Sequence, residues 1–239
     1  MFFNNRNIQK LSLIAVFVFL LGCALKQPIV EKDPALEAQN LEAQKEQEQF
    51  KQALGLVQAE NATENDLLKA KNILNALYGS NSAYIGALIN SADISLKLKN
   101  LDQAKTLYLE ALQKIEDQQV TGVSTGKTAD KSTKPKQVVS ENINIFMIHT
   151  YNQLGLIERQ LGQFGQAEAY YRKALALDSN NAITIKNLAI LLDLYRGELA
   201  EAFTLYKQYQ DLVGDSDPKI KDWLYDLKNR LPVEEAADE

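Results

Sequence analysis

The sequence predicts an all-α fold built from helical hairpins, on three observations. Alanine, leucine, glutamine, lysine and glutamate are abundant, whereas the 239 residues include only 11 glycines and 5 prolines, and such a composition favours helix. Apolar residues recur at helical spacing in paired runs, and no run of alternating strands is found. Similar spacings of small and aromatic residues return after about 34 residues. The length suffices for one sizeable domain or a short repeat array.

Residues 1–22 are predicted to form a signal peptide. Arg6 and Lys10 give this segment a basic start, and residues 11–21 are almost wholly apolar. A charged start followed by a short apolar core is typical of an export signal. The apolar run is too short for a membrane span, which takes roughly 18 or more residues.

The apolar run ends in Leu-Leu-Gly-Cys at residues 20–23, which resembles the lipobox of bacterial lipoproteins. The resemblance implies cleavage before Cys23 and acylation of that cysteine, with palmitate among the chains and no other cofactor. One acyl chain holds a protein reversibly, and two or more hold it stably. Because Ala24 and Leu25 follow instead of an aspartate, the resemblance also implies the outer membrane, on its periplasmic face. The alternative is that Cys23 is an incidental residue of a signal anchor.

The charge of the mature chain argues against nucleic-acid binding. Removal of residues 1–22 takes away two cations and no acid, which lowers the formal net charge from −5 to −7. Phosphates need a positive surface, so an acidic chain is a poor candidate for binding them. Since Cys23 is the only cysteine, the chain cannot form an internal disulfide.

The sequence predicts a protein that is not an enzyme. His149 is the only histidine, which rules out any site that needs two. No clustered metal ligands, no glycine-rich phosphate loop and no G-x-S-x-G motif occur. A carboxylate pair formed by Glu158 and Asp193, both on predicted first helices of hairpins, is the alternative that stays open.

Residues 23–34 are predicted to be a lipidated tether, because they contain two prolines and little periodic apolar content. Asp33 followed by Pro34 is a favourable helix start, with a capping residue before a proline in the first turn. A long polar helix should run from there to about Glu60 with one solvated face. A coiled-coil contact is the alternative, weakened because no apolar heptad pattern persists.

Residues 148–181 contain the clearest helical hairpin. Two apolar runs at helical spacing flank a break at Gly162 and Gly165, where glycine allows the positive φ of a helix end. The segment resembles a tetratricopeptide repeat at six positions: Leu154, Gly155, Gly162, Ala167, Tyr171 and Ala174. It departs from the family at Glu158, where an aromatic residue is usual, and at Ser179, where proline is usual.

The resemblance implies a right-handed superhelix of about four such hairpins over residues 35–231, closed by a C-terminal capping helix. The fourth hairpin has a turn at 195–199 that is one residue longer than standard, and it carries Tyr209 where alanine is usual. Trp223 is expected to be a core anchor rather than a ligand platform. An acidic tail, 232–239, follows. The predicted parts are repeats at 51–84, 85–118, 148–181 and 182–216, and the capping helix at 217–231.

Residues 120–140 interrupt the array. They lack aromatic residues and are rich in serine, threonine, glycine and lysine, so they cannot bury enough apolar surface to offset the entropy of ordering. We predict a mobile insertion. It is either a solvated segment of no function or a basic arm for an acidic partner or the anionic cell wall, through Lys127, Lys131, Lys134 and Lys136.

In the repeat family the ligand-facing positions lie on the first helix of each hairpin. This mixture of apolar and polar residues can hold an extended peptide or a helix. The lysine and asparagine arrangement with which some members clamp a C-terminal carboxylate is not reproduced. The alternative for His149 is a solvated or capping role. Carried over to this chain, the predicted partner-binding residues are Ile89, Asp93 and Leu96 in the second repeat, His149, Asn152, Leu156 and Arg159 in the third, and Ile183, Lys186, Ile190 and Asp193 in the fourth.

Two functions follow from these expectations. The first is a noncatalytic, lipid-anchored adaptor that binds envelope proteins in the periplasm. Resembling lipoproteins act in type IV pilus assembly, as scaffolds for cell-wall enzymes, or as accessories of TonB-type complexes. The second is a peptidoglycan-binding or cell-wall-modifying protein that uses the basic insertion and the acids of the groove on glycan.

Overall fold

The computed structural model describes residues 34–80, 84–122 and 135–231. The predicted signal peptide, Cys23 with its tether, and the acidic tail therefore lie outside the described residues. The chain divides into two compact units, residues 1–41 and 42–239. Of the first unit only the beginning of one helix is described, and all the following packing belongs to the second.

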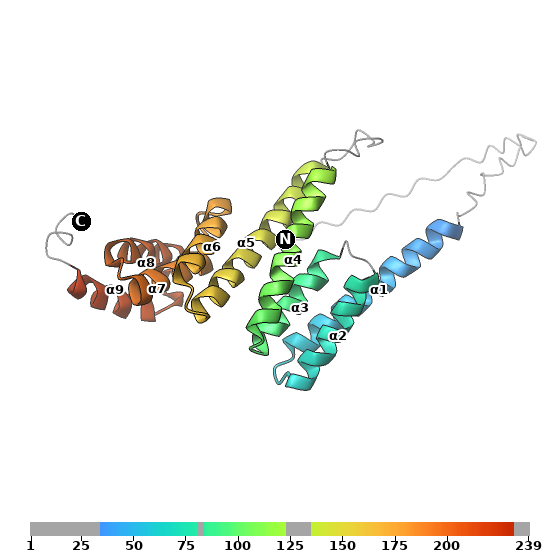
Figure 1. Ribbon diagram of the computed structural model, residues 1–239, viewed down its shortest axis with the longest axis horizontal. Coiled ribbons are helices and arrows are strands. Elements are labelled where there is room, and N and C mark those ends of the chain that lie inside the picture. Colours follow the sequence, from blue (N-terminus) through green and yellow to red (C-terminus); the bar gives the residue numbers. More distant parts are fainter. Residues whose placement is uncertain (1–33, 81–83, 123–134, 232–239) are drawn as a thin grey trace, which may run out of the picture. The chain divides into compact units, whose positions relative to one another are not determined.

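The described residues form nine α-helices, one π-helical turn and one 3-10 turn, without a strand, which confirms the predicted all-α class (Figure 1). In the part of the chain covered by these elements, no helix combines the length and apolarity needed to cross a bilayer. The α-helices are α1 Pro34–Gln58, α2 Glu64–Ser80, α3 Ile85–Lys97, α4 Leu101–Gly122, α5 Pro135–Gln160, α6 Phe164–Leu177, α7 Ala182–Leu191, α8 Leu199–Val213 and α9 Lys219–Arg230, and the short turns are η1 Leu192–Arg196 and η2 Gly214–Ser216.

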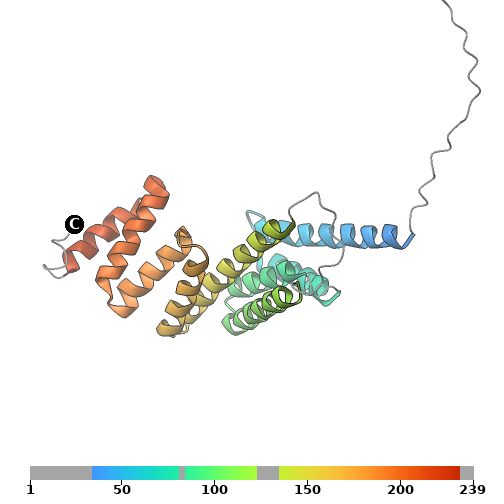
Figure 2. The same ribbon diagram turned by 90° about the horizontal axis from the view of Figure 1, so that it is seen from above.

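The helices pair into successive hairpins (Figure 2). The closest pairs are α3 with α4, α5 with α6, and α7 with α8. Each hairpin also contacts the next, since α2 packs on α3, α4 on α5, and α6 on α7. The last helix, α9, packs on α8. This stack of helical hairpins with a final helix agrees with the predicted architecture.

The helices flanking the predicted insertion are longer than expected. Helix α4 continues to Gly122, and α5 begins at Pro135, so the two ends of the segment 120–140 are helical rather than part of a loop. Proline is well tolerated in the first turn of a helix, where its missing N–H has no partner to lose. Residues 123–134 lie outside the described part of the chain, and their mobility stays a prediction.

Three apolar clusters form the core of the hairpins. Their largest fully buried side chains include Tyr108, Tyr171 and Tyr206, which occupy corresponding places in three hairpins. The small residues that the repeat pattern places nearby, such as Ala104 and Ala167, have no exposed surface. Burial raises the pKa of Tyr171 to about 12, so its phenol stays neutral at physiological pH. Small side chains thus let the helices approach, and tyrosines fill the space between them.

The extra residue of the fourth hairpin is accommodated in a π-helical turn. The predicted long turn at 195–199 is in part helical, because Leu192–Arg196 winds more widely than an α-helix. Gly197 then adopts a positive φ of 71°, and the N–H of Glu198 donates to the carbonyl of Leu192 at 3.0 Å. The wide turn absorbs one residue, so α8 can still bury Tyr206.

Helix α9 closes the last hairpin with its apolar side. Ile220 and Leu227 are fully buried in the same cluster as α7 and α8. Trp223 packs against this cluster, with its ring 5.6 Å from that of Tyr206, as expected of a core anchor. Tyr209, at the position where alanine is usual, lies beneath α9 and donates from its hydroxyl to Asp217 at 3.0 Å.

We predict that Gly155→Ala destabilises the fold by about 1–3 kcal/mol. A Cβ at Gly155 would lie 2.5 Å from Cε1 of Tyr171, and the buried ring has nowhere to move without opening a void. Urea denaturation followed by circular dichroism measures the change. Gly165→Ala is the matched control in the same hairpin, because a Cβ there meets nothing within 4 Å. Equal stability of the two variants would contradict the close-approach argument.

Candidate functional site

The predicted partner-binding residues differ in their exposure. Ile89 is 3% exposed and belongs to the core cluster formed around α3 and α4. Leu96 packs against the same cluster, and Asn152 is 7% exposed. We therefore correct the assignment of Ile89 from the groove surface to the core. The reason is that α5 covers this side of α3, which the repeat pattern alone does not show.

Asp93 and His149 connect the first helices of two neighbouring hairpins. His149 Nε2 lies 2.8 Å from Asp93 Oδ1, between α5 and α3. Asp93 also accepts a hydrogen bond from the hydroxyl of Tyr108. The pKa of Tyr108 is raised strongly, first by burial and then by the Asp93 carboxylate. Asp93 and His149 thus hold α3, α4 and α5 together, and His149 is a bridging residue rather than a freely solvated one.

A similar polar contact joins α5 and α7. The side-chain amide of Asn187 donates to Oδ1 of Asn152 at 3.0 Å. Leu156 and Arg159 lie further along α5 and are half-buried. Nη1 of Arg159 is buried and has no hydrogen-bond partner among the described side chains. The third hairpin therefore contacts the second through His149 and the fourth through Asn152.

Helix α9 and the residue Asp217 just before it engage the inner residues of the fourth hairpin. Lys186 Nζ lies 2.6 Å from Asp217 Oδ2, and the same ammonium lies over the ring of Trp223 at 5.5 Å. The hydrogen bond to Asp217 raises the pKa of Lys186, and the same bond lowers the pKa of Asp217. Asp193 pairs with Arg230 at 2.8 Å. Two of the predicted partner-binding residues, Lys186 and Asp193, therefore form ion pairs within the chain.

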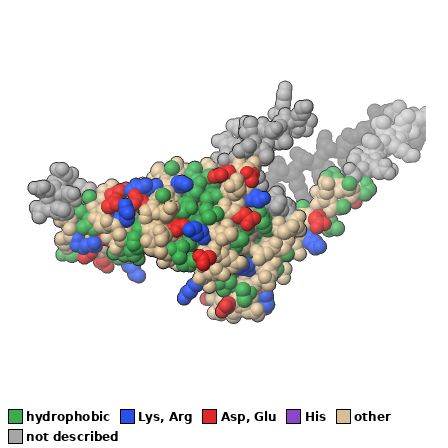
Figure 3. Space-filling view, in the orientation of Figure 1, with side chains coloured by type: hydrophobic (Ala, Val, Ile, Leu, Met, Phe, Trp, Pro, Cys, Tyr) green, Lys and Arg blue, Asp and Glu red, His purple; other side chains and the backbone are tan. Residues whose placement is uncertain are grey.

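An open surface remains between α5 and α7. Ile183 is 67% exposed and Ile145 is 61% exposed, so two large aliphatic side chains face solvent on adjacent first helices. A pocket of about 210 Å³ lies at this place, and Figure 3 shows other apolar side chains gathered among charged ones on one face. The pocket is lined by Ile145, Ile148, His149, Asn152, Asp178, Asn181 and Ile183. We call it the α5/α7 pocket.

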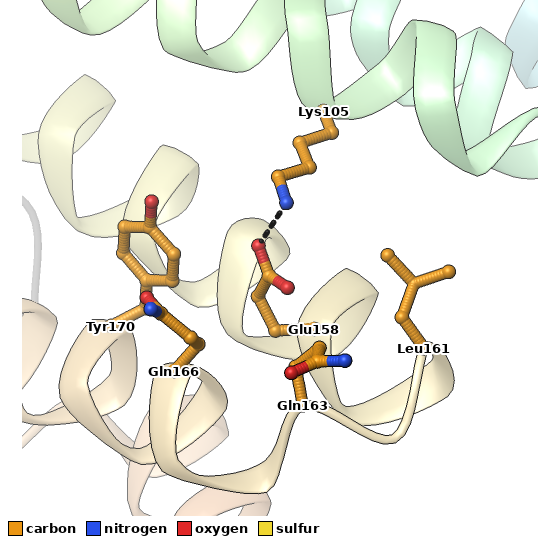
Figure 4. A pocket seen from close by; sticks show the side chains of 6 residues that line it. All are labelled: Lys105, Glu158, Leu161, Gln163, Gln166 and Tyr170. Carbon is orange, nitrogen blue, oxygen red and sulfur yellow. Dashed lines mark ion pairs between the residues drawn. The ribbon is translucent and has the colours of Figure 1, made fainter.

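A second, more polar pocket of about 490 Å³ lies where α4 faces α5 and α6 (Figure 4). Glu158 occupies the place where the repeat family usually has an aromatic residue. Its side chain is only 3% exposed and pairs with Lys105 Nζ at 2.7 Å. This hydrogen bond raises the pKa of Lys105. The ion pair connects the second and third hairpins.

The two carboxylates considered as a catalytic pair, Glu158 and Asp193, are each paired with a cation. Glu158 is held by Lys105, whereas Asp193 is held by Arg230. Among the residues that the structure describes, no group of three potential metal ligands occurs. The polar groups of the inner helices are engaged mostly with each other.

Sequence reasoning missed Ile145, Asp178, Asp217 and Arg230. Ile145 precedes the matched repeat, and Asp178 lies in the turn between two repeats, so neither occupies a ligand-facing position of the motif. The spacing of Ile145, Ile148 and Asn152 along one helix was a usable signal. The pairing of Asp217, just before α9, and of Arg230, near the end of α9, carried no signal, because it depends on how that helix packs.

Comparison with known proteins agrees with this geometry. Residues 149–181 and residues 85–113 each match a family profile described as tetratricopeptide repeat. No curated protein matches the sequence.

Two solved structures are similar in fold. YrrB, described as a TPR protein with an unusual peptide-binding site, is 17% identical with a TM-score of 0.53, over 84% of this chain and 84% of that one. The MamA RS-1 ArsTM double mutant is 13% identical with a TM-score of 0.50, over 70% and 76% of the two chains. At these identities the likeness concerns the fold alone.

We predict that Lys105→Met destabilises the protein by about 1–3 kcal/mol. The buried Glu158 carboxylate loses its cation, but water screens part of the interaction because the Lys105 side chain is 36% exposed. Adding Glu158→Phe should recover most of the loss, since the position then carries an apolar ring. The measurement is the urea midpoint of each variant. Lys221→Met is the control, because Lys221 and its partner Asp215 are 62% and 89% exposed, and it should leave the midpoint unchanged. No difference between Lys105→Met and this control would show that the pair contributes nothing.

Proposed function

Because the chain contains tetratricopeptide repeats, we propose that it is a noncatalytic scaffold that binds a protein partner on the open surface between α5 and α7. One observation supports this proposal above the others. Ile145 and Ile183 are large, aliphatic and mostly exposed on first helices, the side of the hairpins on which members of the repeat family bind ligands. Exposed apolar side chains beside a pocket are typical of interaction sites.

The remaining inner residues support a scaffold rather than a reaction site. The two carboxylates Asp93 and Asp193 are committed to His149 and Arg230, so they hold helices in place. The alternative of a glycan-binding or glycan-modifying protein relied on these acids and on the basic insertion. It therefore receives no support from the arrangement of the inner helices.

We further propose that the scaffold is anchored by lipid on Cys23 to the periplasmic face of the outer membrane. The motivation is the sequence Leu-Leu-Gly-Cys after a basic start and an apolar core. A partner in the cell envelope follows from this location. Pilus assembly, cell-wall synthesis and TonB-type transport are the pathways in which we would seek it.

We predict that the double substitution Ile145→Arg and Ile183→Arg reduces the captured partner at least tenfold, because two charges replace the apolar contacts. Cross-linking in cells, followed by quantitative mass spectrometry, measures the captured proteins. The fold should be unaffected, since both side chains are exposed. Tyr225→Arg is the control, because Tyr225 is 74% exposed on α9. Capture that is equal in all three proteins would place the binding surface elsewhere.

We predict that Cys23→Ser abolishes incorporation of a labelled palmitate analogue and releases the protein from the membrane fraction. The thiol is the acylated group of a lipobox, and a serine hydroxyl does not replace it. Ala24→Asp should keep the label but move the protein to the inner membrane, as the resemblance to lipoproteins implies. Labelled Cys23→Ser would rule out this cysteine as the anchor.

A further inference from the structure

The α5/α7 pocket has the size of a site for one side chain. Its volume of about 210 Å³ is below the range of roughly 300–1,000 Å³ that is usual for small-molecule sites. Ile145 and Ile183 provide its exposed apolar lining. A single large aliphatic or aromatic side chain of a partner would cover both isoleucines and remove them from water.

Most polar groups of the pocket already have partners inside the protein. Asn152 accepts from Asn187 at 3.0 Å, and His149 lies 2.8 Å from Asp93. Asn181 caps α7, because its side chain accepts from the N–H of Thr184. These bonds engage the oxygens of the two amides and Nε2 of the histidine, and they fix the shape of the pocket.

Asp178 differs from these groups because it carries a negative charge and forms no ion pair with the described side chains. Its carboxylate accepts one hydrogen bond, from the N–H of Asn180 at 3.0 Å. No ion pair of this carboxylate is found with the side chains that the structure describes, and no lysine or arginine among them lines the pocket. The carboxylate therefore gives the pocket a negative charge that the described surroundings leave uncompensated. A cationic group of a ligand would complement it.

We propose that the α5/α7 pocket recognises a peptide segment in which a large apolar side chain enters between Ile145 and Ile183 and a neighbouring lysine or arginine pairs with Asp178. This inference rests on the proposed function and specifies the chemistry of the partner. An acidic segment is disfavoured, because it would bring a second negative charge to Asp178 without a cation in the pocket wall to pair with. The recognised signature is thus one apolar anchor with a basic residue within one or two positions.

A displayed library of random peptides tests the signature. The full chain in mild detergent and its Ile183→Arg variant are each used for selection. We expect that peptides enriched on the native protein and lost on the variant carry a leucine, isoleucine, phenylalanine or methionine next to a lysine or arginine. Enrichment that depends on Ile183 but shows no basic residue, or an acidic one, would overturn the inference while leaving the proposed function in place. If no enriched peptide depends on Ile183, both the inference and the proposed site are wrong.

The ion pair is tested on one enriched peptide by a double-mutant cycle. Asp178→Asn should weaken binding of the peptide by about threefold to fivefold, and this loss should disappear when the basic residue of the peptide is alanine. The matched control is Asp211→Asn, which changes an exposed acid of α8 and should leave the affinity unaltered. Fluorescence anisotropy measures the affinity, and higher salt should reduce the effect of Asp178. An equal loss for both peptides would show that Asp178 does not contact the basic residue.

Discussion

The close approach of paired helices is the constraint on which the rest of this structure depends. Gly155 lies directly against the ring of Tyr171, and the equivalent tyrosines Tyr108 and Tyr206 are buried in the neighbouring hairpins. Protein interiors are packed nearly as densely as crystals, so one additional methyl group between two helices can prevent their close approach. A small residue on one helix and an aromatic ring on the other fix the spacing of each hairpin. The spacing of the hairpins then determines which side chains face each other on the first helices.

That arrangement explains why most of the inner polar residues are not free. Asp93 with His149, Asn152 with Asn187, and Asp193 with Arg230 each join two neighbouring elements. A half-buried polar group without a partner loses hydration and gains nothing in return. Pairing across neighbouring helices satisfies these groups and fixes the register of the stack. The surface left for a partner is therefore smaller than the whole row of first helices.

The sequence predicts the hairpins well and the surface only in part. Repeated small and aromatic residues such as Gly155 and Tyr171 report directly on helix packing, so the fold class and the order of the hairpins are correct. The exposure of Ile89 was not predictable in this way, because it depends on how α5 covers α3. The length of α5 was also missed, since composition placed residues 135–140 in a loop. The local sequence pattern shows which side of a helix is apolar. Which other helix packs on that side depends on residues far away in the sequence.

The last helix has a consequence for the quaternary behaviour of the chain. The bare end of a stack of similar hairpins presents the kind of surface through which one hairpin packs on the next. Copies of the chain joined head to tail through such a surface form an open filament unless the rotation closes a ring. Ile220 and Leu227 fill that end, and the opposite side of α9 presents charged residues such as Lys221 and Asp222 to solvent. A head-to-tail contact at this end would therefore have to displace α9.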